Sequence, residues 1–221
     1  MASVERTSAG RTMKRKSVPL LWMGVAFGVA FAMAATVLAD VRIDEDSLVT
    51  ALRLTARWSF TLFWMAYVAG PMAVLFGPAF APLARRGREF GLAFASAHLV
   101  HIGLVVWLYV ILHHAPLSGG LLVFFMIGIF WTYLLAVLSF GGLARALGPI
   151  LWRLVRVLGM NYILIAFGYD FVLSVVHNGV VHQGFKYLVE YVPFAAMSVA
   201  APVLSFAAAV RRQWGVRQVA A

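Results

Sequence analysis

A nearly unbroken run of apolar residues from Phe90 to Leu112 limits what this chain can fold into. An α-helix rises about 1.5 Å per residue, so a run of this length crosses the roughly 30 Å hydrocarbon core of a bilayer. The composition extends the argument to the whole chain, because 63% of its 221 residues are hydrophobic, only 12% are charged and the mean hydropathy is +0.90. Soluble domains carry roughly twice that share of charge. The chain is therefore predicted to be an integral membrane protein that contacts the lipid bilayer.

Apolar runs of comparable length recur along the chain and predict an all-α, polytopic membrane protein built as a six-helix transmembrane bundle. The expected spans cover residues 18–38, 58–75, 90–112, 121–140, 158–176 and 191–210. A transmembrane domain is therefore expected over residues 18–210, between a basic N-terminal segment at 1–17 and a basic tail at 211–221. The first run ends in Val37-Leu38-Ala39-Asp40, which also fits a signal-peptidase site, but its length favours a retained helix.

The basic residues, which give a formal net charge of +10, stand mainly in short segments beside the apolar runs. Lys and Arg in such segments are retained on the cytoplasmic side, so both termini are expected to be cytoplasmic, with a bacterial inner membrane as the expected location. No basic soluble module is present to bind nucleic acid. The chain has no cysteine, which excludes iron–sulfur ligation and thiolate chemistry. Without a GxGxxG or P-loop motif, nicotinamide, flavin or nucleotide chemistry would require a partner.

The histidines gather in two segments, the third span and the stretch after the fifth: His98, His101, His113, His114, His177 and His182. The thirteen-residue step from His101 to His114 rises about 20 Å, so one helix could hold an imidazole near each membrane face. With the basic segments inside, the last four histidines fall at the outer face. Imidazoles that two segments bring to one depth can ligate haem iron between helices. Outer-face histidines can equally be ordinary solvated loop residues.

Other polar residues lie inside the apolar spans. His98 and His101 are three residues apart and share a helix face. One of them could ligate haem while the other supports that ligand or contacts a quinone. Alternatively, both could be neutral imidazoles that form hydrogen bonds to other helices. Asp170 is expected to face the bundle interior, because an uncompensated carboxylate in a membrane is unfavourable by about 3 kcal/mol. It could form a proton relay with His177, bond a haem pocket or make a structural contact. Asn161 and Tyr162 could extend this polar lining.

The segment Arg85-Arg86, followed by Gly91-Leu92 and then by His101, is similar to the start of the third helix in the ferric reductase-like transmembrane family. That family includes the haem-binding membrane subunit of the periplasmic methionine sulfoxide reductase system. The resemblance implies a six-helix bundle that holds haem b between histidines of two helices and passes electrons across the membrane. It implies that His101 is the inner iron ligand and that His114 or His113 is the outer one.

The fifth helix departs from the family pattern. Its segment Trp152-Arg153-Leu154-Val155-Arg156 resembles the family's fifth-helix start but contains no histidine, so this chain has an incomplete histidine set. Ile163 and Leu164 stand where the inner partner of His101 would be expected.

The leading hypothesis is a membrane protein that binds one haem b near the outer face and relays electrons to a partner protein or quinone. His113 or His114 would then oppose His177 or His182, with His101, His114 and His177 as the named candidates for iron ligation. No catalytic residue is assigned, and any enzymatic role would be that of the electron-transfer membrane subunit of an oxidoreductase. The alternative is a haem-free scaffold, accessory subunit or transporter-like protein in which the histidines and Asp170 form a structural or proton-handling network.

Overall fold

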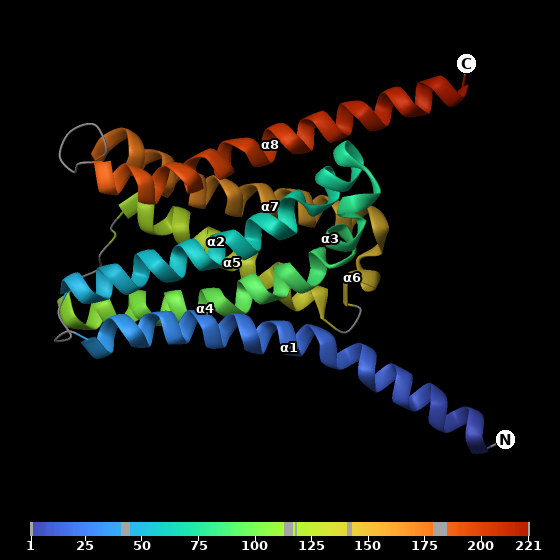
Figure 1. The fold of residues 1–221 in the computed structure, drawn as a ribbon, viewed down its shortest axis with the longest axis horizontal. Helices are drawn as coiled ribbons and strands as arrows, with labels where there is room; N and C mark the ends of the chain where they lie inside the picture. Colours follow the sequence, from blue (N-terminus) through green and yellow to red (C-terminus); the bar gives the residue numbers. More distant parts are fainter. Residues whose placement is uncertain are drawn as a thin grey trace. The chain divides into compact units, whose positions relative to one another are not determined.

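The computed structural model describes residues 2–40, 45–112, 117, 119–140, 143–178 and 185–220, and the regular structure in this part is helical (Figure 1). The elements follow one another as α1 (Ala2–Asp40), α2 (Glu45–Phe76), the short 3-10 turn η1 (Pro78–Phe80), α3 (Ala81–Arg85), α4 (Gly87–Leu112), α5 (Gly119–Ser139), α6 (Leu143–Ala146), α7 (Gly148–Leu173), the π-helical turn η2 (Ser174–Asn178) and α8 (Phe185–Ala220).

Six of these segments are long and apolar enough to cross a membrane: Val18–Ala39, Glu45–Phe76, Gly87–Ile111, Gly119–Ser139, Gly148–Val176 and Val189–Trp214. The prediction of an all-α, polytopic membrane protein with six spans is confirmed for the described part of the chain.

Two spans begin well before their expected positions. The second begins at Glu45 rather than Trp58, and the fifth begins at Gly148 rather than Leu158. Sequence patterning assigns the arginines before these spans to loops, whereas four of them lie inside the helices: Arg53, Arg57, Arg153 and Arg156. An arginine in the first turns of a span, such as the exposed Arg153, can keep its apolar stem along the helix and extend its guanidinium toward headgroups and water. Charge alone therefore places the start of a span too late.

The chain divides into two compact units, which are described separately. Unit 1 comprises Met1–Leu62 and Glu89–Pro116, and unit 2 comprises Phe63–Arg88 and Leu117–Ala221. The first boundary falls inside α2, so that helix contributes its first part to unit 1 and its second part to unit 2.

In unit 1, small side chains allow three helices to approach closely. Ala26, Ala30 and Ala34 are buried at four-residue intervals along one face of α1. Ala34 belongs to a core cluster that also contains Leu48 from α2 and Leu104 from α4. Membrane helices gain little from burying apolar surface, because lipid is also apolar, so close packing of small residues is a main source of their association.

Polar side chains of α2 and α4 also bond to α1. The indole of Trp58 donates from Nε1 to the carbonyl of Ala26 at 3.1 Å, and the hydroxyl of Ser96 donates to the carbonyl of Met23 at 2.9 Å. The packing order is consistent with the core cluster, in which residues late in α1 meet residues early in α2 and late in α4. Within unit 1, α2 therefore runs antiparallel to both α1 and α4.

In unit 2, α7 packs between α5 and α8, as Figure 1 shows. Glycine makes the α5 and α7 contact possible: a Cβ atom on Gly159 would lie 2.8 Å from Cε3 of Trp131 and 2.9 Å from Cδ1 of Leu135. The α7 and α8 contact includes Phe171, whose ring lies 5.3 Å from that of Phe194. These helices can pack tightly only because the positions at the crossings are small or flat.

Two arginines bind the carbonyl groups at helix ends in unit 2. Arg88 donates from Nε and Nη2 to the carbonyl of Ser139, at 3.0 and 2.7 Å, at the end of α5. Arg211 donates from Nη1 to the carbonyl of Leu75, near the end of α2. The last carbonyls of a helix lack partners within the helix, and a cation there also complements the helix dipole.

Candidate functional site

His98 and His101, which we call the histidine pair, lie on α4 within unit 1. Their rings stack with centroids 5.2 Å apart and planes inclined by 13°. The ring of Phe94, one turn earlier, lies 5.5 Å from that of His98, so three rings form a column along one face of α4. His98 is buried, whereas His101 is only partly buried. The spacing of three residues correctly predicted that the two imidazoles share a helix face.

A backbone carbonyl of α2 fixes the orientation of His101. Nδ1 of His101 lies 3.2 Å from the carbonyl oxygen of Leu52. A carbonyl oxygen can only accept a hydrogen bond, so Nδ1 must carry the proton for this bond to form. We therefore assign the Nδ1–H tautomer to the neutral ring, which leaves the lone pair on Nε2.

Thr55 lies beside the same nitrogen. Its Oγ1 is 3.3 Å from Nδ1 of His101 and is fully buried. The hydroxyl proton is directed at carbonyls of its own helix, with Ala51 at 2.9 Å and Leu52 at 3.1 Å. The oxygen of Thr55 is thus left to accept a hydrogen bond from Nδ1–H of His101. The contact with Thr55 therefore supports the same tautomer as the bond to Leu52.

Ser59 extends this polar face of α2 by one turn. It is fully buried, and within the described part of the chain its Oγ has no hydrogen-bond partner. Several other hydroxyls of the described helices bond the carbonyl four residues earlier, as Thr61 does with Arg57. Ser59 therefore adds hydrogen-bonding capacity to the interior of unit 1 that its own helix does not use.

The arrangement at the histidine pair can do two things chemically. An imidazole whose Nδ1–H is bonded to a carbonyl presents Nε2 as a ligand for a metal, which is the usual second-shell pattern around metal-bound histidine. The same nitrogen can accept a proton or a hydrogen bond instead. Among the residues that the structure describes, no group of three histidine, aspartate or glutamate side chains could hold a metal ion by itself.

The outer histidines are not tested by the structure. His113, His114 and His182 lie outside the described residues. The backbone of His177 lies in the π-helical turn Ser174–Asn178, but its side chain is not described. Ligation by these four histidines stays a prediction. The proton relay expected between Asp170 and His177 depends on the angle between the two residues around the helix axis, and the π-helical turn changes that angle from its α-helical value.

Asp170 was expected to face the interior of the bundle, but it is exposed. It lies in the last turn of α7, six residues before the span ends at Val176. Six helical residues rise only about 9 Å, so the carboxylate is near a membrane face rather than at mid-membrane. The penalty that would force it into an interior pocket is correspondingly reduced.

Asn161 and Tyr162 connect helices of unit 2. Asn161 accepts a hydrogen bond at Oδ1 from the hydroxyl of Tyr67 at 2.8 Å and donates from Nδ2 to the carbonyl of Val157 at 2.7 Å. Tyr162 donates to the carbonyl of Phe124 on α5 at 3.0 Å. The two side chains therefore serve different interfaces, one with α2 and one with α5, and they do not form one continuous lining.

Sequence reasoning missed Thr55 and Ser59. Thr55 precedes the expected second span at residues 58–75, and Ser59 is only the second residue inside it, so neither hydroxyl stood out as buried well within a span. Their spacing of four residues places them on one helix face and would have been a usable signal once the helix was extended back to Glu45.

Six candidate spans define the protein as a polytopic helical membrane protein, and the histidine pair, of which His98 is buried and His101 partly buried, forms a polar site within unit 1. The chain matches no protein family, no curated protein and no solved structure.

Proposed function

We propose that this chain is a haem b-binding membrane protein of the ferric reductase-like type, which passes electrons to a partner. The observation that carries the proposal is the hydrogen bond from Nδ1 of His101 to the carbonyl of Leu52, which leaves Nε2 available for iron. His101 is also the residue that matches the inner ligand in the family resemblance. Haem would supply the one-electron redox chemistry that the proposal requires.

The residues around His101 would serve to hold the ligand. Leu52 and Thr55 fix the tautomer and limit rotation about the ring axis. The stacked ring of His98 limits the tilt of the His101 plane. Because His98 is buried whereas His101 is partly exposed, His101 is the better placed of the two to meet a group at the edge of unit 1.

A second axial ligand is not supplied by the fifth span, because Gly148–Val176 contains no histidine. A haem on His101 would therefore keep one position open or take a ligand other than an imidazole of that span. The outer site, between His113 or His114 and His177 or His182, remains the bis-histidine alternative. Orientation with both termini in the cytoplasm remains part of the proposal.

An optical spectrum of the full-length protein, purified after expression with ample haem, tests this function. We expect a Soret band and about one haem per chain by the pyridine haemochromogen assay. His101→Phe should remove or shift the band, whereas His98→Phe keeps an aromatic ring in the stack and should leave it in place. A band that survives His101→Phe but is lost when the outer histidines are replaced would transfer the site to the outer end.

A second candidate is favoured by the stacking itself. The rings of the histidine pair contact one another, and His101 is bonded within unit 1, so the pair can act as a structural or proton-handling element without haem. The chain would then be an accessory or transporter-like membrane protein. In that case no chromophore co-purifies, and His98→Phe lowers stability as much as His101→Phe. Asp170→Asn would alter a transport or pH response.

A further inference from the structure

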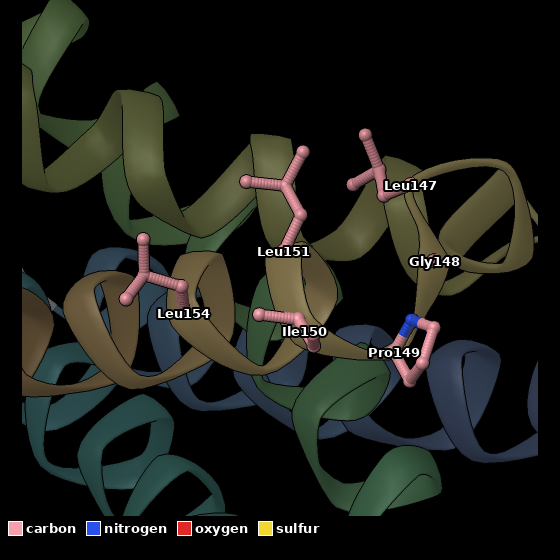
Figure 2. A pocket seen from close by; sticks show the side chains of 6 residues that line it. All are labelled: Leu147, Gly148, Pro149, Ile150, Leu151 and Leu154. Carbon is pink, nitrogen blue, oxygen red and sulfur yellow. The ribbon is translucent and has the colours of Figure 1, made fainter.

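An apolar hollow lies at the start of α7 in unit 2. Its volume is about 350 Å³, and Figure 2 shows the side chains around it: Leu147, Gly148, Pro149, Ile150, Leu151 and Leu154. None of these six residues has a polar side chain. A molecule that occupies the hollow must therefore present hydrocarbon to it.

The hollow lies at the end of a candidate membrane span. Gly148 is the first residue of the span Gly148–Val176, so the hollow is near the level where hydrocarbon meets lipid headgroups. Ile150 is 85% exposed and Leu154 is 57% exposed. In a membrane-spanning chain, such side chains at the first turns of a span would contact acyl chains.

The same end of the helix is strongly basic. Arg145 precedes the hollow by two residues and Arg153 immediately precedes Leu154, and both arginines are exposed. No aspartate or glutamate occurs between Phe90 and Tyr169. The two acids of unit 2 are Asp170, near the other end of α7, and Glu190, at the start of the last span. Asp170 is 22 residues from Gly148, or about 33 Å along a helix, so it cannot neutralise these arginines.

We propose that this hollow binds an anionic phospholipid. One acyl chain would lie against Ile150, Leu151 and Leu154, and the phosphate would contact the guanidinium groups of Arg145 and Arg153. The charge complementarity selects the headgroup and the apolar wall selects the chain, so the site favours a lipid over a soluble phosphate. Basic sites at the ends of membrane helices commonly bind anionic lipid headgroups.

The test uses the full-length protein in a neutral detergent and measures binding by native mass spectrometry. The probes are phosphatidylglycerol and phosphatidylcholine with identical acyl chains, and glycerol phosphate, which has the anionic group without chains. Two variants alter the site, Arg145→Gln with Arg153→Gln in one chain, and Leu151→Trp, which fills the hollow. Their matched controls are Arg212→Gln and Val199→Trp, at exposed positions on α8.

We expect phosphatidylglycerol to bind at least tenfold more tightly than phosphatidylcholine. A surface arginine contributes about fivefold to anionic lipid binding, so the double arginine variant should lose most of this preference. Leu151→Trp should weaken the binding of phosphatidylglycerol, whereas both control variants should leave this binding unchanged. Equal binding of the two lipids, an equal loss in the controls, or full competition by glycerol phosphate would overturn the proposal. Thermal unfolding of each variant without lipid separates loss of binding from loss of the fold.

Discussion

Nδ1 of His101 on α4 lies 3.2 Å from the carbonyl oxygen of Leu52 on α2, and this bond joins two helices while it fixes the tautomer of the imidazole. A histidine held in this way is both a structural link and a potential ligand. The predictions below separate these roles.

Thr55→Val tests the support given to His101. Valine matches threonine in shape but removes the oxygen that lies 3.3 Å from Nδ1. Hydrogen bonds between membrane helices average about 0.6 kcal/mol, so the free energy of unfolding should fall by about 1 kcal/mol or less. SDS titration of the purified protein measures this change. Thr50→Val is the matched control, because exposed Thr50 bonds only the carbonyl of Asp46 on its own helix. A loss no larger than in the control would argue against a link between helices at Thr55.

Gly159→Ala should loosen the α5 and α7 contact. The carbon of the added methyl group would lie 2.8 Å from Cε3 of Trp131 and 2.9 Å from Cδ1 of Leu135. Both distances are shorter than packed carbon atoms approach. Overpacking of this kind is unfavourable by about 1–3 kcal/mol. Gly103→Ala on α4 is the control, since a Cβ atom there meets nothing within 4 Å. It should be neutral or stabilising by up to about 1 kcal/mol. If both variants unfold alike, the close packing at Gly159 is not needed for stability.

Tyr67 and Asn161 should be energetically coupled. Their hydrogen bond of 2.8 Å joins the second part of α2 to α7 within unit 2. Tyr67→Phe, Asn161→Leu and the double variant complete a double-mutant cycle, with an expected coupling of about 0.5–2 kcal/mol. Unfolding by SDS, followed by circular dichroism, gives the four free energies of unfolding, those of the unchanged protein and of the three variants. Strict additivity would show that the bond contributes nothing beyond its two side chains.

Carbon monoxide binding should distinguish the two possible haem levels. The span Gly148–Val176 offers no histidine to oppose His101, so a haem on His101 would have an open position if no other ligand replaced that histidine, and the reduced protein should then bind carbon monoxide and shift its Soret band. A haem held between two outer histidines has both axial positions filled and should bind it weakly or not at all. Difference spectra with and without the gas give the answer, and His101→Phe serves as the comparison.

Much of the fold could be predicted from hydropathy, because six apolar stretches must each cross the membrane as helices to satisfy their backbone groups. The starts of α2 and α7 could not, because Arg53, Arg57, Arg153 and Arg156 continue helices whose amides still bond internally. Hydrogen bonding along a helix does not depend on side-chain polarity, whereas the expected starts of these spans were placed by side-chain polarity.

The candidate site was only partly predictable. The spacing of His98 and His101 was sufficient to place both rings on one face, as their stacking shows. The partner of His101 is a backbone carbonyl, which any residue at position 52 would offer, so its identity leaves no signal in the sequence. The expected interior position of Asp170 did not hold because α7 ends soon after it.

The most direct test of the proposed function is the absorption spectrum of the purified, full-length protein expressed with ample haem. The account predicts a Soret band that His101→Phe abolishes or shifts and that His98→Phe preserves. A protein that is folded by circular dichroism but shows no Soret band would contradict it and leave a haem-free helical membrane protein.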